Sequence, residues 1–393
     1  MSDANIRLNK TPVFLRNGFR PFFLGSAIIA ILNTVIWIAY LLGFIEINSI
    51  FSPTNWHLHE MIFGFIGAAI AGFLLTAIPN WTGRPPLKGL NLLSLFLLWV
   101  LGRIVIFYSE YTGALFAALA DLPFFFILSL YIFREIYIQG NKKNLPIAML
   151  VFLFGIANGL MHLETNLNIE TAQYGHRFSL ILISVLVMII GGRIIPNFTT
   201  SWLKNNGSRH LPTLMNKFDL FCIFFSIFAL FSWGILPENK LTGIAIVVSG
   251  ILNGIRLSRW KFGAIYTNPM LVILQTAYAW LVFGLLLLGW FIIISFEQYD
   301  LPIHAITVGG FASMIIAVMT RASLGHTGRA IRASKLTISC YIFINLSVIF
   351  RLLASLTDDL RNELLFLSAL AWILTFLVFI YQYGPYYFSE RKS

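Results

Sequence analysis

Five of the seven histidines lie near the ends of long apolar segments, and imidazole is a common ligand of haem iron and copper. The other two, His210 and His326, fall in basic segments. A single histidine at a membrane interface often has one wet edge and binds nothing. Five at one predicted depth indicate more, because polar groups within a membrane usually mark a functional site. We therefore interpret as a haem- or metal-binding cluster the residues His57, His59, His162, His176 and His304.

Helix geometry places these histidines relative to one another. Residues two apart on a helix point about 200° apart, so His57 and His59 should face different sites if both are helical. His162 closes one apolar segment and His176 opens the next, so antiparallel neighbours should bring their imidazoles to a similar depth. Such a pair suits copper or another borderline metal, and spacing leaves the choice of metal open.

Three arginines and one carboxylate accompany the histidines. Arg103, Arg177 and Arg351 lie toward the same side of the predicted bundle, where other basic residues are few. They are candidate partners of haem propionates or, alternatively, interface anchors that extend toward lipid headgroups. Asp121 lies well inside an apolar segment, where a carboxylate is costly. It could orient a histidine, carry protons or bond a neighbouring helix.

The composition indicates that lipid solvates much of this chain. Of its 393 residues 58% are hydrophobic and 11% charged, with a mean hydropathy of +0.81, whereas soluble domains carry roughly a quarter charged residues. The net charge of +11 does not indicate a nucleic-acid partner, because the basic residues lie in short loops and form no patch. Cys222 and Cys340 sit in separate apolar segments without a CxxC partner, so neither a zinc site nor a disulfide framework is predicted.

Hydropathy predicts an all-α polytopic membrane protein with about twelve transmembrane helices in a single transmembrane domain, 1–393. Alternating these helices across the bilayer puts most of the 27 basic residues on one side, which the positive-inside rule makes cytoplasmic. Both termini are then cytoplasmic, and the five histidines lie near the opposite face. The predicted spans are 22–45, 57–79, 90–108, 112–137, 146–163, 174–196, 217–236, 241–258, 270–296, 301–321, 334–353 and 362–384.

An internal repeat relates three of these spans. A proline-asparagine pair follows His59 and His176 at the same spacing, and Thr-Gly-Arg follows His59 and His304 at the same spacing. We predict three four-helix repeats, approximately 13–140, 141–260 and 261–393. His59 and His304 then occupy equivalent positions on two helices, and such a pair could bind the two axial positions of a haem.

Several motifs resemble the NnrS family over nearly the whole chain. The resemblance implies a bacterial inner-membrane protein that contains haem b and copper and is produced during denitrification and nitrosative stress. The motifs are Arg20-Pro21-Phe22-Phe23-Leu24, Trp56-His57-Leu58-His59-Glu60-Met61, Gly72-Phe73-Leu74-Leu75-Thr76-Ala77, Asn80-Trp81-Thr82-Gly83, Gly192-Arg193-Ile194-Ile195-Pro196-Asn197-Phe198-Thr199 and Gly325-His326-Thr327-Gly328-Arg329.

On this basis we expect the protein to bind nitric oxide, or to process it in redox chemistry, near the periplasmic face. His59 and His304 are the predicted haem ligands, with Arg103, Arg177 and Arg351 as partners of the propionates. The predicted copper ligands are His57, His162 and His176, although His176 could instead serve a second haem. Binding, sensing and turnover of nitric oxide would need the same ligands, so the sequence leaves open whether the protein is an oxidoreductase and what donates electrons.

A weaker resemblance is to the catalytic subunit of haem–copper oxidases, which also has twelve helices and haem histidines on helices 2 and 10. His59 and His304 fit those positions. The tenth span here has one histidine where the oxidase pattern has two, and the seventh has none. The oxidase binuclear centre is therefore not carried over. The alternative of another class is a multi-pass transporter of a small molecule or metal ion, which twelve spans and the intramembrane Asp121 would also fit.

Overall fold

The computed structural model describes residues 11–140, 142–167, 169–296 and 298–392, and in these ranges it contains helices and no strands. Twelve helices are long and apolar enough to cross a membrane, which confirms the predicted all-α polytopic fold. They span Phe19–Leu41, Pro53–Thr82, Leu90–Phe107, Ala114–Ile138, Lys142–Leu167, Ala172–Asn205, Lys217–Ile235, Lys240–Ala264, Pro269–Ile293, Asp300–His326, Lys335–Ala354 and Arg361–Phe388.

The chain divides into two compact units, each made of several segments. Unit 1 comprises residues 1–179, 319–331 and 379–393, and unit 2 comprises residues 180–318 and 332–378. Three helices run through the boundary: α10 (Ala172–Asn205), α15 (Ser313–His326) and α17 (Arg361–Phe388). These boundaries do not coincide with the predicted repeats, and the threefold repeat remains a prediction.

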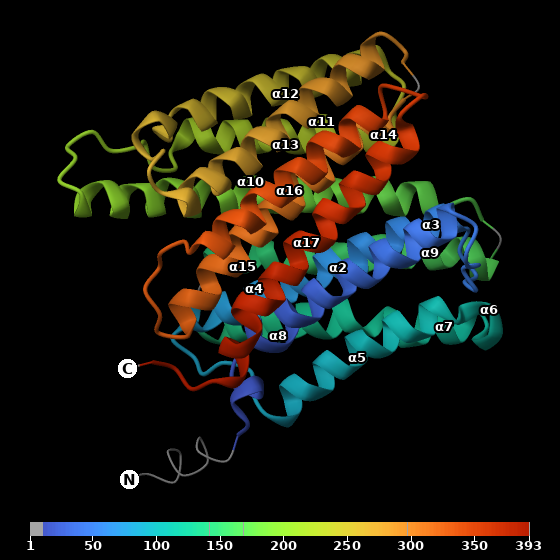
Figure 1. The fold of residues 1–393 in the computed structure, drawn as a ribbon, viewed down its shortest axis with the longest axis horizontal. Coiled ribbons are helices and arrows are strands. Elements are labelled where there is room, and N and C mark those ends of the chain that lie inside the picture. The colour runs from blue at the N-terminus through green and yellow to red at the C-terminus, as the bar shows by residue number, and fades with distance from the viewer. Residues whose placement is uncertain (1–10, 141, 168, 297, 393) are drawn as a thin grey trace. The chain divides into compact units, whose positions relative to one another are not determined.

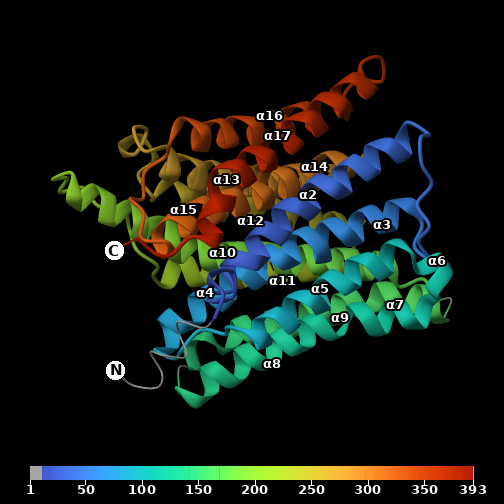
Figure 2. The ribbon, with the colours of Figure 1, turned by 60° about the horizontal axis from the view of Figure 1, so that its bottom comes forward.

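Unit 1 holds four of the five predicted site histidines in closely packed helix pairs. The first transmembrane helix, α2, packs along α4, α5 contacts α7, and α8 runs beside α9 (Figures 1 and 2). The interior is largely aromatic, and Phe22, Phe63 and Phe125 are each at most 1% exposed. The helices of this unit begin and end as follows: α2 (Phe19–Leu41), α3 (Pro53–His59), α4 (Gly67–Thr82), α5 (Leu90–Phe107), α6 (Ser109–Thr112), α7 (Ala114–Asp121), α8 (Pro123–Ile138) and α9 (Leu145–Leu167).

Unit 2 contains His304 and is organised around α13, which packs along α12 (Figure 1) and contacts the π-helix η5. Polar caps start two of its helices: Asn216 forms a reciprocal capping box with Asp219 at α11, and the Asn268 side chain accepts from Met270 N at α13. The elements of this unit are α11 (Lys217–Ile235), α12 (Lys240–Ser258), α13 (Pro269–Ile293), α14 (Asp300–His304), η5 (Ala305–Ala312) and α16 (Lys335–Ala354).

Two π-helical segments mark corresponding places in the second and tenth spans. The π-helix η2 (Glu60–Ile66) begins directly after His59, and η5 (Ala305–Ala312) begins directly after His304. The span that contains His176 is a continuous α-helix, α10. π-helical turns are rare in proteins, and those that occur often lie at functional sites. This shared irregularity therefore distinguishes His59 and His304 from the other histidines.

The first and last described segments contact each other within unit 1. Phe14 stacks on Phe388 with ring centroids 4.8 Å apart, and Arg16 Nη1 lies 2.5 Å from Glu390 Oε2. The Arg20 guanidinium, 3% exposed, donates to the carbonyl oxygens of Tyr386, Tyr387 and Ser389 at the end of α17. A guanidinium satisfies the terminal carbonyls of a helix well. These contacts put both segments on one side of the bundle, as an even number of spans requires.

Unit 2 has a fully buried arginine that joins three helices to its own helix, α12. Arg256 donates to Asp219 Oδ1 on α11 at 2.8 Å, to the Met188 carbonyl on α10 at 2.9 Å and to the Tyr278 hydroxyl on α13 at 2.9 Å. Its Nη2 atom occupies the space in which a side chain of residue 192 would stand. The glycine of the Gly192-Arg193 motif is therefore explained by helix packing.

We expect Gly192→Ala to lower the thermal stability of the protein sharply. The added methyl group must displace the Arg256 guanidinium and break hydrogen bonds of a buried ion pair, which costs about 3–5 kcal/mol when one partner is lost. Gly191→Ala is the matched control, because a methyl group there meets Tyr278 at an ordinary 3.5 Å. Thermal unfolding of both variants in detergent measures the difference. Equal melting temperatures would contradict this explanation.

Candidate metal centre

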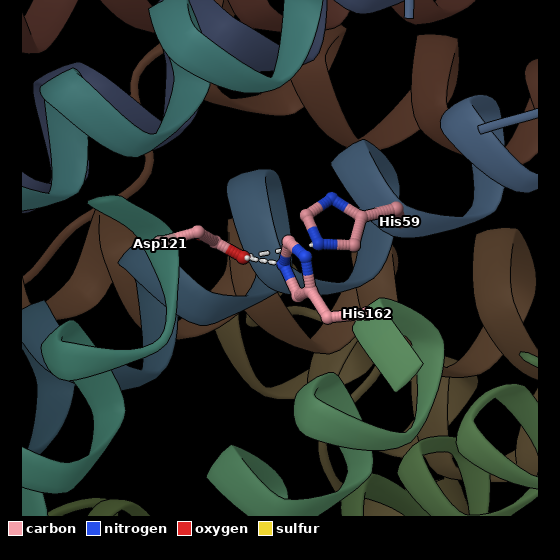
Figure 3. Close-up of side chains that lie close together, drawn as sticks. All are labelled: His59, Asp121 and His162. Carbon is pink, nitrogen blue, oxygen red and sulfur yellow. Dashed lines mark hydrogen bonds and ion pairs between the residues drawn. The ribbon is translucent and has the colours of Figure 1, made fainter. Parts of the chain in front are cut away.

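Three side chains from three helices of unit 1 converge on one point. His59 is the last residue of α3, Asp121 is the last residue of α7, and His162 lies near the C-terminal end of α9 (Figure 3). Asp121 Oδ2 is 3.1 Å from His59 Nε2 and 3.1 Å from His162 Nε2. The three ligand-type atoms all lie within 4.8 Å of one another. Because the three side chains are at most 2% exposed, this point is enclosed by protein.

Local sequence signals fix the two helix ends that carry His59 and Asp121. Ser52 caps α3 by accepting a hydrogen bond from Asn55 N, and Pro53 is the first residue of the helix. On the other side, Pro123 begins α8 two residues after Asp121, and a proline cannot continue the hydrogen-bond pattern of the preceding helix. Gly102 on α5 allows the close approach of Asp121, since a Cβ atom there would stand 2.9 Å from Asp121 Oδ1.

A buried guanidinium holds the two carboxylates of the cluster. Arg103, 6% exposed, donates from Nη1 to Glu60 Oε1 at 2.5 Å and from Nη2 to Asp121 Oδ1. Asn158 donates to Asp121 Oδ2 at 2.7 Å. Arg103 thus engages one oxygen of Asp121, and the other oxygen is directed at the two imidazoles.

The hydrogen bonds of His59 indicate that a positive charge belongs at this point. His59 Nδ1 lies 3.0 Å from Glu60 Oε1, while Nε2 faces Asp121 Oδ2 and Asn158 Oδ1, the latter at 2.9 Å. A neutral imidazole carries one N–H, so one of these nitrogens presents a lone pair to oxygen lone pairs. A metal ion or a bound proton between them removes that repulsion.

The donor set also suits a transition metal in type and spacing. Two imidazoles and one carboxylate are ligands shared by copper, zinc and non-haem iron sites. Two ligands each about 2.1 Å from a tetrahedral metal lie about 3.4 Å apart, close to the two observed 3.1 Å separations. His162 Nδ1 is buried without a hydrogen-bond partner. Phe51 and Phe63 stand against the imidazoles, with centroids 5.0 and 5.1 Å from the His59 ring, and supply an apolar shell.

The structure separates His57 from this cluster. The His57 ring stacks on Trp37 of α2, with centroids 4.4 Å apart and planes inclined by 20°, and the residue is half-buried. His57 and His59 therefore face different surroundings, as their helical spacing predicts. Among the described residues, the set whose ligand atoms converge is His59, Asp121 and His162, without His57.

His176 lies close along the chain to a tight contact between α9 and α10. A Cβ atom on Gly175 would stand 2.7 Å from the Ala157 carbonyl oxygen and 2.9 Å from Met161 Cγ, so the neighbours of His162 and His176 in sequence touch. The half-buried His176 has a buried Nε2 atom without a hydrogen-bond partner. The nearby Arg177 contacts Gln173 at 3.5 Å.

His304 and Arg351 share a second polar group, within unit 2. His304 Nδ1 is 2.6 Å from the Asp300 carbonyl oxygen. Because a carbonyl only accepts, Nδ1 carries a proton. Asp300 Oδ2 also accepts from Arg351 Nη2 at 3.3 Å and from the Ser355 hydroxyl at 2.7 Å. His304 lies in unit 2, whereas His59 lies in unit 1.

Two members of the cluster, Glu60 and Asn158, were not singled out by the sequence analysis. Glu60 directly follows His59 and carries the charge that pairs with Arg103. Asn158 precedes His162 by one helical turn, so both side chains lie on one face of α9. That spacing was the available signal. The two carboxylates that the Nη atoms of Arg103 engage, Glu60 and Asp121, were also not predicted as its partners.

The comparisons with known proteins give one family. A protein-family model described as NnrS protein matches residues 13–391, which is nearly the whole chain. No curated protein sequence matches the chain. The match includes every residue of the cluster in unit 1 and both His304 and Arg351 in unit 2.

Proposed function

This chain belongs to the NnrS family, and on that premise we propose that it is a haem b- and copper-binding protein of the bacterial inner membrane. It binds nitric oxide, or processes it in redox chemistry, near the periplasmic face during denitrification and nitrosative stress. The periplasmic assignment follows from the distribution of basic residues over the loops. The observation that carries the proposal is the convergence of His59, His162 and Asp121 on one buried point.

Copper is held in this proposal by His59 Nε2, His162 Nε2 and Asp121 Oδ2. His59 moves from the haem pair predicted from sequence to the copper site, because its Nε2 faces Asp121 and Asn158. Glu60 orients His59 through Nδ1, an arrangement that fixes the tautomer and orientation of metal-bound imidazoles. His57 and His176, which the sequence predicts as copper ligands, do not belong to the converging set of His59, Asp121 and His162.

Haem is held in this proposal by His304. The Asp300 carbonyl binds Nδ1 of the ring, which leaves Nε2 as the coordinating atom. A π-helix, which is often found at functional sites, begins directly after His304. Arg351, already bound to Asp300, is the propionate partner in the same unit. Arg103 is less suited to that role, because Glu60 and Asp121 occupy its Nη atoms.

Bound copper and haem would each supply a one-electron couple and a coordination position for nitric oxide. The residues of the chain bind, orient and enclose. Phe51 and Phe63 exclude water from the imidazoles, and Arg103 keeps Asp121 in place. Nitric oxide is a small neutral molecule, so an apolar surround admits it from the lipid.

Two single substitutions test the proposal through independent losses. We expect His304→Ala to remove the haem Soret absorption while copper, measured by elemental analysis, stays bound. His162→Ala should do the opposite, because the two residues belong to separate polar groups. Purified wild-type protein is the reference for both measurements. A colourless wild-type preparation free of copper would reject the proposal.

A further inference from the structure

The charged groups that would surround a metal ion bound at Asp121 can be counted. Each carboxylate, Glu60 and Asp121, is paired directly with the Arg103 guanidinium. One positive and two negative groups leave one net negative charge, with the imidazoles neutral as ligands. All these groups are at most 6% exposed. Water therefore screens this charge little.

Two other buried or half-buried carboxylates on the surrounding helices, Glu164 and Glu135, are engaged elsewhere. Glu164, on the same helix as His162, accepts from Asn55 Nδ2 and from Ala172 N at the outer end of the unit. Glu135, on α8, pairs with Arg84 and Arg134. In the described part of the chain, the ring nitrogens of His59 contact Glu60, Asp121 and Asn158, and Nε2 of His162 contacts Asp121. Asp121 is also contacted by Asn158 and Arg103.

A net charge buried at membrane depth is costly, so the most stable occupied state is the neutral one. A monovalent cation makes the cluster neutral, whereas a divalent cation leaves one positive charge. Resting on the copper site proposed above, we infer that the charges around this centre favour a monovalent ion, Cu(I), relative to divalent ions, and that Arg103 sets this electrostatic preference. Arg103 is a positioning residue, since it acts through Asp121 and Glu60 and not on the metal.

The inference makes two charge variants act in opposite directions. A nearby charge acts on an ion in proportion to the charge of that ion, so its effect on a divalent ion is twice that on a monovalent ion. Arg103→Gln removes a positive charge and should shift selectivity toward divalent ions by about tenfold or more. Glu60→Gln removes a negative charge and should shift it by a similar factor toward monovalent ions.

The test uses redox-inert probes, Ag(I) for the monovalent and Zn(II) for the divalent ion. Affinities for metal-free full-length protein are measured by chelator competition in a Cys222→Ala, Cys340→Ala background, because thiols bind Ag(I). The ratio of the two affinities in each variant, divided by that of the parent, cancels the intrinsic preference of imidazole for either ion. Glu135→Gln is the matched control. Glu135 lies 12 residues after Pro123, the first residue of α8, which corresponds to about 18 Å of helix rise. This variant should leave the affinity ratio unchanged.

The outcomes separate this inference from the proposed function. Opposite shifts in Arg103→Gln and Glu60→Gln support it, and a ratio that stays constant in both overturns it while copper binding stands. If Arg103→Gln does not fold, the isosteric Glu60→Gln carries the test alone, and a ratio equal to that of Glu135→Gln overturns the inference. Absence of copper, Ag(I) and Zn(II) binding in the parent would instead reject the proposed copper site, and the inference with it.

Discussion

Replacing Arg103 by methionine is expected to lower the free energy of unfolding by about 3–5 kcal/mol, the usual cost of removing one partner from a buried ion pair. The variant leaves Glu60 and Asp121 buried beside each other without a counter-charge. Methionine fills much of the volume of the arginine stem, so the loss reflects charge more than packing. Titration with sodium dodecyl sulfate in mixed micelles measures the unfolding free energy of metal-free protein.

Two further variants show whether that loss of stability comes from the buried charges. Adding Glu60→Gln to Arg103→Met should recover part of the stability, because one buried carboxylate is then neutral. Arg351→Met, which breaks a partly exposed pair with Asp300 in unit 2, should cost no more than about 1 kcal/mol. If Arg103→Met and Arg351→Met destabilise equally, the guanidinium of Arg103 is not a counter-charge for two carboxylates.

The twelve helices were predictable from sequence because each span is a long apolar signal. Glu60, Asp121 and Arg103 lie within spans and scarcely alter their hydropathy, so length and composition alone identify the spans. Even the predicted eighth span, 241–258, which is short and interrupted by glycines, is a helix from Lys240 to Ser258. The π-helices after His59 and His304 were beyond prediction, since hydropathy carries no information on whether a helical turn has one extra residue.

Which site residues contact one another was harder to predict than which residues belong to the site. The sequence placed His162 near the C-terminal end of its span and singled out Asp121 and Arg103, and it grouped His162 with His57 and His176. Which imidazoles meet depends on how α3, α7 and α9 pack together, and that is a property of the tertiary structure. Arg103 was associated with propionates because its carboxylate partners lie on two other helices, 43 and 18 residues away. The charged pair is visible only after the fold brings them together.

Copper affinity is expected to fall by more than about a hundredfold in His162→Gln and to stay unchanged in His57→Gln. Loss of a group that merely orients a ligand already costs about 10–100-fold, and loss of a ligand costs more. His162 presents Nε2 to Asp121 in the cluster, whereas His57 is stacked on Trp37. Competition with a chromophoric Cu(I) chelator under reducing conditions measures both affinities.

The same titration on His59→Gln and His176→Gln distinguishes the two ligand sets. The set that converges in the structure requires a large loss in His59→Gln, because its Nε2 faces Asp121 Oδ2 at 3.1 Å. The set predicted from sequence requires large losses in His57→Gln and His176→Gln and none in His59→Gln. A loss in His176→Gln together with His59→Gln, and none in His57→Gln, would add a third imidazole from α10 to the converging set. The unpartnered Nε2 of His176 would then be explained by coordination.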